Sequence, residues 1–129
     1  MVLLLAAVYL LIGIAFAEFS DWATTSVMHL MWRRLAWLVS GVGFAAHIAY
    51  EHFRLGNSPR TTAMHASIAA ALGAGALAVA ANVHEWMAAS SYRPSIAIAL
   101  VVWPLLTAVP AFVVAMVAGA ALNRWCRRS

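Results

Sequence analysis

Residues 35–83 read LAWLVSGVGFAAHIAYEHFRLGNSPRTTAMHASIAAALGAGALAVAANV, and this stretch decides the fold. It contains two apolar runs, residues 35–53 and 63–83, on either side of a short polar turn at residues 57–59. Each run is close to the length of about 20 residues that a helix needs to cross the hydrocarbon layer of a membrane. Asn, Ser and Pro in succession are typical of a turn. The stretch therefore predicts two antiparallel membrane-spanning helices.

Apolar runs also lie on both sides of this hairpin, at residues 1–17 and 95–122. Of the 129 residues, 65% are hydrophobic and 9% are charged. A soluble domain is usually about 45–50% apolar and about a quarter charged. These values exclude a soluble domain, a disordered tail and a secreted disulfide scaffold. We expect residues 1–129 to form a single domain, an all-α integral membrane protein with four transmembrane helices in a small antiparallel bundle.

The linker between the first two runs, residues 18–34, is longer than the other connections. Its apolar side chains could lie on one face, which predicts a short interfacial helix after the first span. Ala, Phe and Ala at residues 15–17 have the pattern of a signal-peptide cleavage site. Because no basic residue precedes the first apolar run, we expect that run to be a retained helix.

The arginines predict the orientation of the spans. One side of the membrane would hold Arg54, Arg60, Arg124, Arg127 and Arg128, and the other side would hold Arg33, Arg34 and Arg93. Basic residues concentrate on the cytoplasmic side of a membrane protein. We therefore expect a multi-pass protein of a bacterial inner membrane with both termini in the cytoplasm. Since the arginines flank the spans, the net charge of +4 does not predict binding to nucleic acid.

Small residues recur at helical spacing in residues 63–83. One face carries Ala66, Ala69, Ala70, Gly73, Ala76 and Ala80, and another carries Ser67, Ala71 and Gly75. Helices in lipid associate through close contact of small residues, because lipid tails are as apolar as leucine. We expect residues 35–53 and 63–83 to pack tightly as a hairpin. Two small faces also predict that the second of these helices is central, or that one face meets a different subunit.

A cluster of ionisable residues is predicted at the cytoplasmic end of the hairpin. His47 and Glu51 are four residues apart, so they share a helix face. Folding about the turn brings His65 level with Glu51. Ionisable groups within a membrane indicate function by default, and these three could relay a proton, coordinate a metal, hold a quinone head group or ligate a b-type haem. We prefer the alternative that Glu51 pairs with Arg54 or His65 and staples the hairpin.

A second group of metal-ligating residue types is predicted on the outer side. It consists of Glu18, Asp21, His29, His84 and Glu85. These residues are a candidate metal site by type, but no HExxH motif or cysteine pair organises them. Acids and histidines at a membrane surface usually face water or pair with arginine, and we prefer that interpretation.

The sparse polar residues and the small-residue faces favour a non-catalytic role. We expect a small subunit that anchors or stabilises a larger inner-membrane complex, energy-transducing or transport, with other membrane subunits or further copies of this chain as partners and with structural lipids bound. One alternative is an electron-transfer subunit that binds b-type haem or quinone through His47 and His65. Another is a small oligomeric channel or exchanger with Glu51 as its charged site. The serines and Cys126 have no evident base beside them, so we do not expect an enzyme in the chain alone.

Overall fold

The computed structural model describes residues 1–88 and 94–126, and within these ranges the chain forms four helices. They are α1 (Val2–Asp21), α2 (Ser26–Phe53), α3 (Pro59–Ala88) and α4 (Pro94–Cys126). The all-α class predicted from composition is therefore confirmed. Three of the arginines on which the predicted orientation rests, Arg93, Arg127 and Arg128, lie outside the described residues.

In the described part of the chain, three helices are long and apolar enough to cross a membrane. The candidate spans are Val2–Asp21 in α1, Pro59–Met87 in α3 and Ala97–Cys126 in α4. The chain is thus compatible with a multi-pass membrane protein. Helix α2 is 28 residues long, but Arg33, Arg34 and its buried His and Glu make it less apolar than the others. A fourth span at residues 35–53 therefore stays a prediction.

The linker after the first span does not form a helix of its own. Residues 26–34 are instead the first turns of α2. Thr25 has an extended backbone and caps this helix, because its hydroxyl accepts a hydrogen bond from the backbone N–H of Met28 at 3.2 Å. No proline or turn interrupts the chain between this cap and Phe53. The prediction of a separate interfacial helix is therefore wrong.

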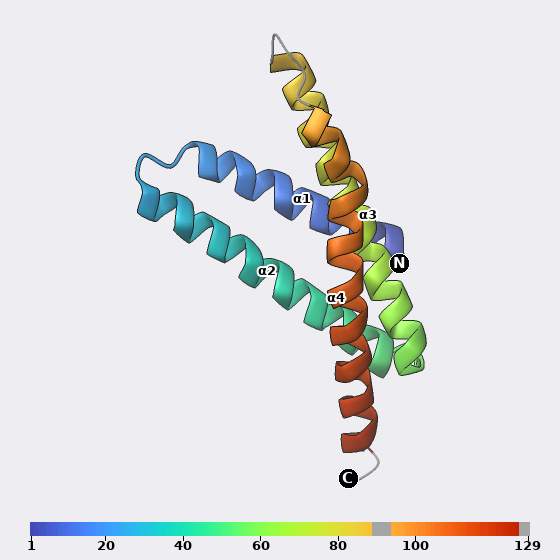
Figure 1. Ribbon diagram of the computed structural model, residues 1–129. Coiled ribbons are helices and arrows are strands. Elements are labelled where there is room, and N and C mark those ends of the chain that lie inside the picture. Colours follow the sequence, from blue (N-terminus) through green and yellow to red (C-terminus); the bar gives the residue numbers. More distant parts are fainter. Residues whose placement is uncertain (89–93, 127–129) are drawn as a thin grey trace.

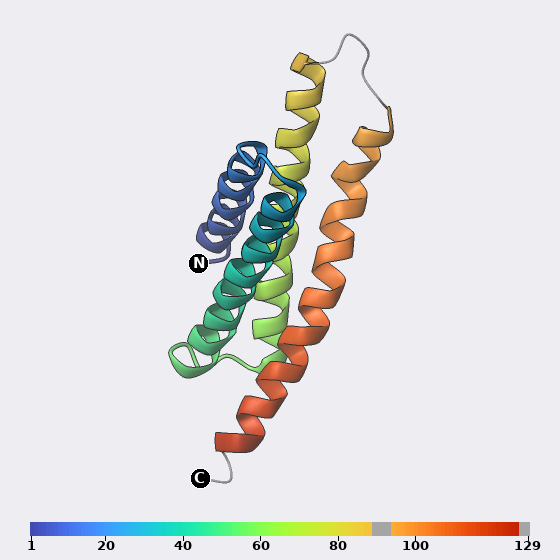
Figure 2. The same ribbon diagram turned by 90° about the vertical axis from the view of Figure 1, so that its left-hand side faces the viewer.

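The helices form two antiparallel pairs that cross. Helices α1 and α2 make one pair and α3 and α4 the other, and the first pair crosses the second obliquely (Figure 1). The view turned by 90° shows α3 between α4 and the α1–α2 pair (Figure 2). Helix α3 contacts each of the other helices, and its packing against α4 is the most extensive. The central position predicted for this helix is confirmed.

The small residues of α3 face α1 and α4. An added Cβ at Gly73 would lie 2.8 Å from the Cβ of Tyr9 in α1, and one at Gly75 would lie 3.4 Å from the Cγ of Pro104 in α4. A Cβ at Gly41 of α2 would meet no atom within 4 Å. Helix α2 also contacts α3 much less than α1 and α4 do. The prediction that residues 35–53 and 63–83 pack tightly together is therefore wrong, because α1 and α4 occupy the small faces of α3.

The hydrophobic core lies where α2 ends, α3 begins and the second half of α4 passes. We call this place the three-helix junction; its buried apolar side chains are Ile48, Ala63, Ala66 and Ala115. The largest fully buried side chains of the described chain are polar, namely His47, Glu51 and Thr62. The fold therefore buries its polar groups at the same end as its core.

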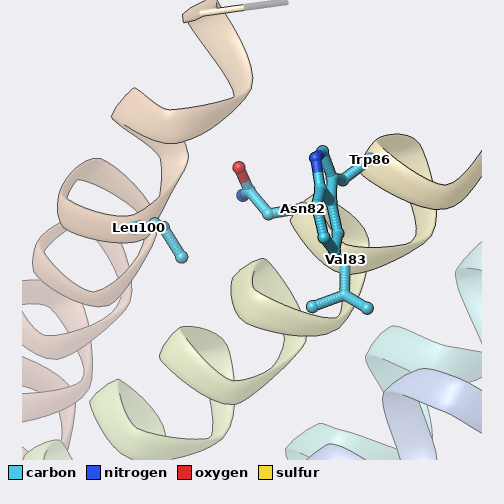
Figure 3. A pocket seen from close by; sticks show the side chains of 4 residues that line it. All are labelled: Asn82, Val83, Trp86 and Leu100. Carbon is cyan, nitrogen blue, oxygen red and sulfur yellow. The ribbon is translucent and has the colours of Figure 1, made fainter. Parts of the chain in front are cut away.

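Near the far end of α3 a pocket of about 470 Å³ lies between α3 and α4. Asn82, Val83 and Trp86 line it from α3, and Leu100 lines it from α4 (Figure 3). The amide of Asn82 donates to the backbone carbonyl of Ala78 at 2.8 Å. Apart from this amide and the indole N–H of Trp86, the side chains that line the pocket are apolar (Figure 3).

Candidate functional site

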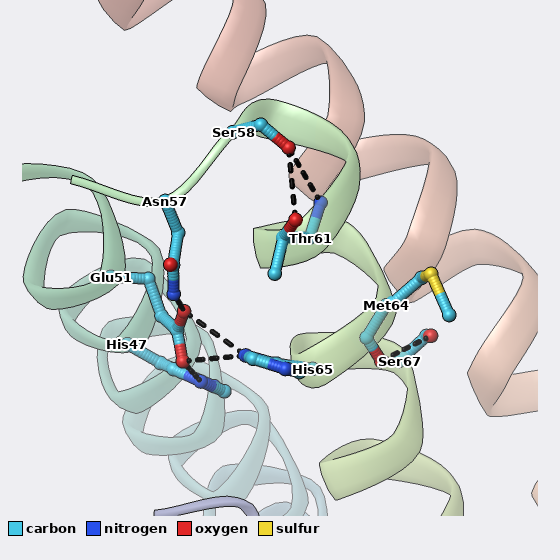
Figure 4. Close-up of polar contacts among 8 residues, drawn as sticks. All are labelled: His47, Glu51, Asn57, Ser58, Thr61, Met64, His65 and Ser67. Atoms are coloured by element: carbon cyan, nitrogen blue, oxygen red, sulfur yellow. Dashed lines mark hydrogen bonds and ion pairs between the residues drawn. The ribbon is translucent and has the colours of Figure 1, made fainter. Parts of the chain in front are cut away.

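The last two turns of α2 place His47 and Glu51 on the face that meets α3. The two residues are 1% and 0% exposed. His65 approaches the Glu51 carboxylate from α3, and Asn57 approaches it from the turn between the helices (Figure 4). We call His47, Glu51, Asn57 and His65 the Glu51 cluster. The structure thus brings together the three ionisable residues that the sequence analysis singled out.

The Glu51 carboxylate is enclosed by donors from the chain itself. The Nδ1 atom of His65 lies 3.1 Å from both carboxylate oxygens, and the side-chain amide of Asn57 donates to Oε2. The Nε2 atom of His47 lies 3.5 Å from Oε1. Of the two partners expected for Glu51, the structure shows His65; Arg54 is exposed. The carboxylate therefore joins α2, the turn and α3.

The turn directs Asn57 back towards Glu51. Helix α2 ends before Gly56, whose φ of +62° lies in the left-handed region that glycine adopts without strain. The backbone N–H of Asn57 then donates to the backbone carbonyl of Glu51 at 3.1 Å. Ser58 begins the next helix, because its hydroxyl accepts from the backbone N–H of Thr61 at 3.2 Å. Asn57 thus binds Glu51 through both its backbone and its side chain.

The Glu51 cluster is buried on one side and reaches the surface on the other. The side chain of His65 is 38% exposed, whereas that of Glu51 is 1% exposed. A buried carboxylate is costly unless hydrogen bonds or opposite charge compensate it. Here two histidines and an amide can do so, and protonation of His65 would make the Glu51–His65 pair neutral overall. The arrangement suits hydrogen bonding and proton exchange.

The cluster in this conformation does not present an open ligand site for iron. His47 and His65 both approach the same oxygen of Glu51. A haem held between these two imidazoles would have to take the place of that carboxylate. In residues 1–88 and 94–126, no group of three or more His, Cys, Asp or Glu side chains could hold a metal ion.

The structure does not bring together the outer group of residues that was a candidate metal site by residue type. Glu18 and Asp21 lie in the last turn of α1, and His29 lies near the start of α2, where its Nδ1 is 2.9 Å from the Ser20 hydroxyl. His84 and Glu85 lie in the last turns of α3. The oblique crossing of the helix pairs separates the end of α1 from the end of α3 (Figure 1). Among the described residues, these side chains make no group of three that could bind a metal.

Sequence reasoning missed several polar residues that the fold buries or pairs. Asn57 was interpreted only as a turn residue, although an amide just after a helix that ends in a buried acid is a usable signal. Tyr9 and Thr62 carry buried hydroxyls that have no hydrogen-bond partner among the described residues. Cys126 lies with its Sγ 4.0 Å from Nε2 of His52, so the ends of α4 and α2 meet.

The chemistry of the Glu51 cluster is therefore inferred from its contacts within this chain. It ties α2 to α3 at the three-helix junction, and it opens to the surface through His65. Comparison with protein-family models, with curated proteins and with solved structures finds no match to this chain.

Proposed function

We propose that this chain is a small non-catalytic subunit that anchors or stabilises a larger complex in the inner membrane of a bacterium, with both termini in the cytoplasm. The observation that carries the proposal is the uncovered face of α2. Trp37 and Val42 are 81% and 70% exposed, and the Cβ position of Gly41 has no atom within 4 Å. We call Trp37, Leu38, Gly41, Val42 and Ala45 the α2 face.

This face has the features of a helix-docking surface. Gly41 and Ala45 are four residues apart and both exposed, which allows the backbone of another helix to approach closely. Helix α2 is also less apolar than the candidate spans, and it meets α3 and α4 mainly at its C-terminal end. A helix of this composition gains more from protein neighbours than from lipid tails, which offer no hydrogen bonds. The partner we propose is an apolar helix of another membrane subunit.

The Glu51 cluster supports a structural role over an exchanger. Its carboxylate is enclosed and receives hydrogen bonds from two neighbours in the same chain. A charge held in this way stabilises the junction of α2 with α3, because removing either partner would leave a buried polar group unpaired. The energy-transducing or transport nature of the larger complex is part of the proposal.

Site-specific photo-crosslinking in native membranes tests this function. A photo-crosslinking residue replaces Val42 on the α2 face in one variant and Val117 of α4 in the other. Val42 and Val117 are similar in exposure, at 70% and 64%. We expect the probe at position 42 to capture one discrete membrane polypeptide of different sequence, and the probe at position 117 to capture lipid.

Two outcomes of the crosslinking experiment would overturn the proposal. One is that both probes capture only lipid, and the other is that the probe at position 42 captures only a second copy of this chain. A purified monomer that carries out a complete activity alone would equally contradict a non-catalytic role.

A further inference from the structure

The Tyr9 hydroxyl on α1 and the imidazole of His47, the member of the Glu51 cluster deepest in α2, are buried and have no hydrogen-bond partner among the described residues. His47 is 1% exposed, and its nearest polar contact is the Nε2–Oε1 distance of 3.5 Å to Glu51, which is longer than a good hydrogen bond. Buried polar groups in native proteins find partners, and where no protein group serves, internal water does.

Tyr9 and His47 occupy neighbouring levels of the interface between α1 and α2. The Cε1 atom of Tyr9 lies 3.8 Å from the Cβ position of Gly43. His47 follows Gly43 by one turn on the same face of α2, about 6 Å along the axis. Helical side chains lean towards the N-terminus of their own helix. Because α1 and α2 are antiparallel, Tyr9 leans towards the level of His47, and His47 leans towards the level of Gly43.

Gly73 provides the space in which Tyr9 packs, and the Tyr9 ring reaches the Cβ position of Gly43 at ordinary van der Waals distance. A Cβ at Gly73 would lie 2.8 Å from the Cβ of Tyr9, so no larger residue fits there without a shift. The ring is thus held between α2 and α3 while its hydroxyl is buried. A buried hydroxyl and a buried imidazole at neighbouring levels of one interface supply the polar partners that an internal water needs.

We propose that Tyr9 and His47 bind internal water, and that this water, His47, Glu51 and His65 form one path along which protons exchange. The path begins at His65, whose side chain is 38% exposed. Glu51 and Gly43 are two turns apart on α2, so the path reaches about 12 Å into the helices. The ligand of this site is water, and the species that moves along it is the proton.

Each transfer along the path conserves atoms and charge. Protonated His65 gives its Nδ1 proton to a Glu51 oxygen 3.1 Å away, so an N–H bond breaks and an O–H bond forms. Glu51 then gives the proton to Nε2 of His47 when the 3.5 Å between Nε2 and Oε1 closes to hydrogen-bond distance, so the O–H bond breaks and an N–H bond forms. The resulting imidazolium gives its Nδ1 proton to the water at Tyr9, and one proton of that hydronium returns to Nδ1. The excess proton then leaves by the reverse steps, so the path exchanges protons between the internal water and the surface and leaves no net charge inside. No oxidation or reduction takes part.

The inference rests on the Glu51 cluster and on Tyr9, and it is independent of the α2 face. The test uses the full chain in lipid nanodiscs, with histidine labelled by ¹⁵N, and measures magnetisation transfer from water to the ring N–H protons of His47. We expect transfer in the native sequence. In Tyr9→Phe it should fall on the order of tenfold, the effect of losing one ordinary hydrogen bond to the water. The matched control is Tyr50→Phe, at a tyrosine that is 43% exposed, which should leave the transfer unchanged.

A second variant, His65→Gln, tests the entrance. Its amide can still donate to Glu51 but does not titrate, so we expect slower proton exchange at His47. Backbone amide spectra establish that each variant is folded. The measurement on the native chain tests the proposal even where a variant fails to fold. If the ring N–H protons of His47 receive no magnetisation from water, the proposal is overturned. Unchanged transfer in folded Tyr9→Phe would overturn the water site, and unchanged exchange in folded His65→Gln would overturn the path.

Discussion

Glu51 and His65 are joined across the turn between α2 and α3, with Nδ1 of His65 3.1 Å from each carboxylate oxygen. The pair lies at the edge of the three-helix junction, where Ile48 and Ala63 are buried. The small faces of α3 are occupied by α1 and α4, so α2 has little other contact with α3. Glu51 therefore holds α2 in place at this end.

Removing the Glu51 carboxylate should destabilise the fold strongly. We expect Glu51→Ala to lower the free energy of unfolding by about 3–5 kcal/mol, because Asn57 and His65 lose their shared acceptor and the buried His47 loses the carboxylate nearest to it. Glu51→Gln keeps the shape and one acceptor, so its loss should be smaller, about 1–2 kcal/mol. Denaturant titration in detergent, followed by circular dichroism, measures both values. Glu18→Gln, at an exposed acid, is the control and should change the free energy of unfolding by less than about 0.5 kcal/mol. If all three variants had the same effect, Glu51 would not be the residue that joins α2 to α3.

The Asn57 amide should matter through the proton it donates. Asn57→Ala removes one hydrogen bond to Glu51 and should cost about 1 kcal/mol. Asn57→Asp places a second carboxylate beside Glu51, so like-charge repulsion at neutral pH should make it the less stable variant. The same titration compares the two variants. If Asn57→Asp is as stable as the native chain, the amide does not donate to Glu51.

Substitution by alanine should change the free energy of unfolding in opposite directions at a glycine that contacts another helix and at one that does not. The Cβ of Gly73→Ala would lie 2.8 Å from the Tyr9 Cβ and 3.3 Å from the Ala6 carbonyl oxygen, so we expect a loss of about 1–3 kcal/mol from overpacking. Gly41→Ala meets no atom within 4 Å and should gain up to about 1 kcal/mol from helix propensity. Unfolding of the isolated chain measures both. A stabilising Gly73→Ala would contradict the packing of α1 against α3.

Much of the helical content follows from the sequence, but the partners of the helices do not. The apolar runs correctly indicated helices, and the small residues of α3 correctly indicated a central helix. Which neighbour fills each small face depends on shape: Tyr9 fits over Gly73, and Pro104 lies against Gly75. A pattern of alanines and glycines marks a contact surface without naming its partner. The extent of α2 was missed because Thr25, the residue that caps it, lies well before the apolar run.

Only the part of the Glu51 cluster that depends on residue spacing could be predicted from the sequence. Spacing of four residues places His47 and Glu51 on one face, and the antiparallel turn places His65 opposite. The hydrogen bond from Asn57 to Glu51 depends on the left-handed backbone of Gly56. The burial of Tyr9 depends on how α1 packs against α3. These are properties of the assembled helices. The outer acids and histidines, a candidate metal site by residue type alone, do not come together among the described residues because the helix pairs cross (Figure 1), which no spacing along the chain reveals.

The most direct test of the proposed function is the mass of the particle that contains this chain when native membranes are dissolved in a mild detergent. Native mass spectrometry provides it, and the chain itself contributes 13.8 kDa. We predict a particle with a fixed number of copies of this chain and at least one different membrane polypeptide, and its loss in Gly41→Leu, where the new side chain covers the α2 face. A particle made only of this chain and lipid, as a monomer or an oligomer, would contradict the account.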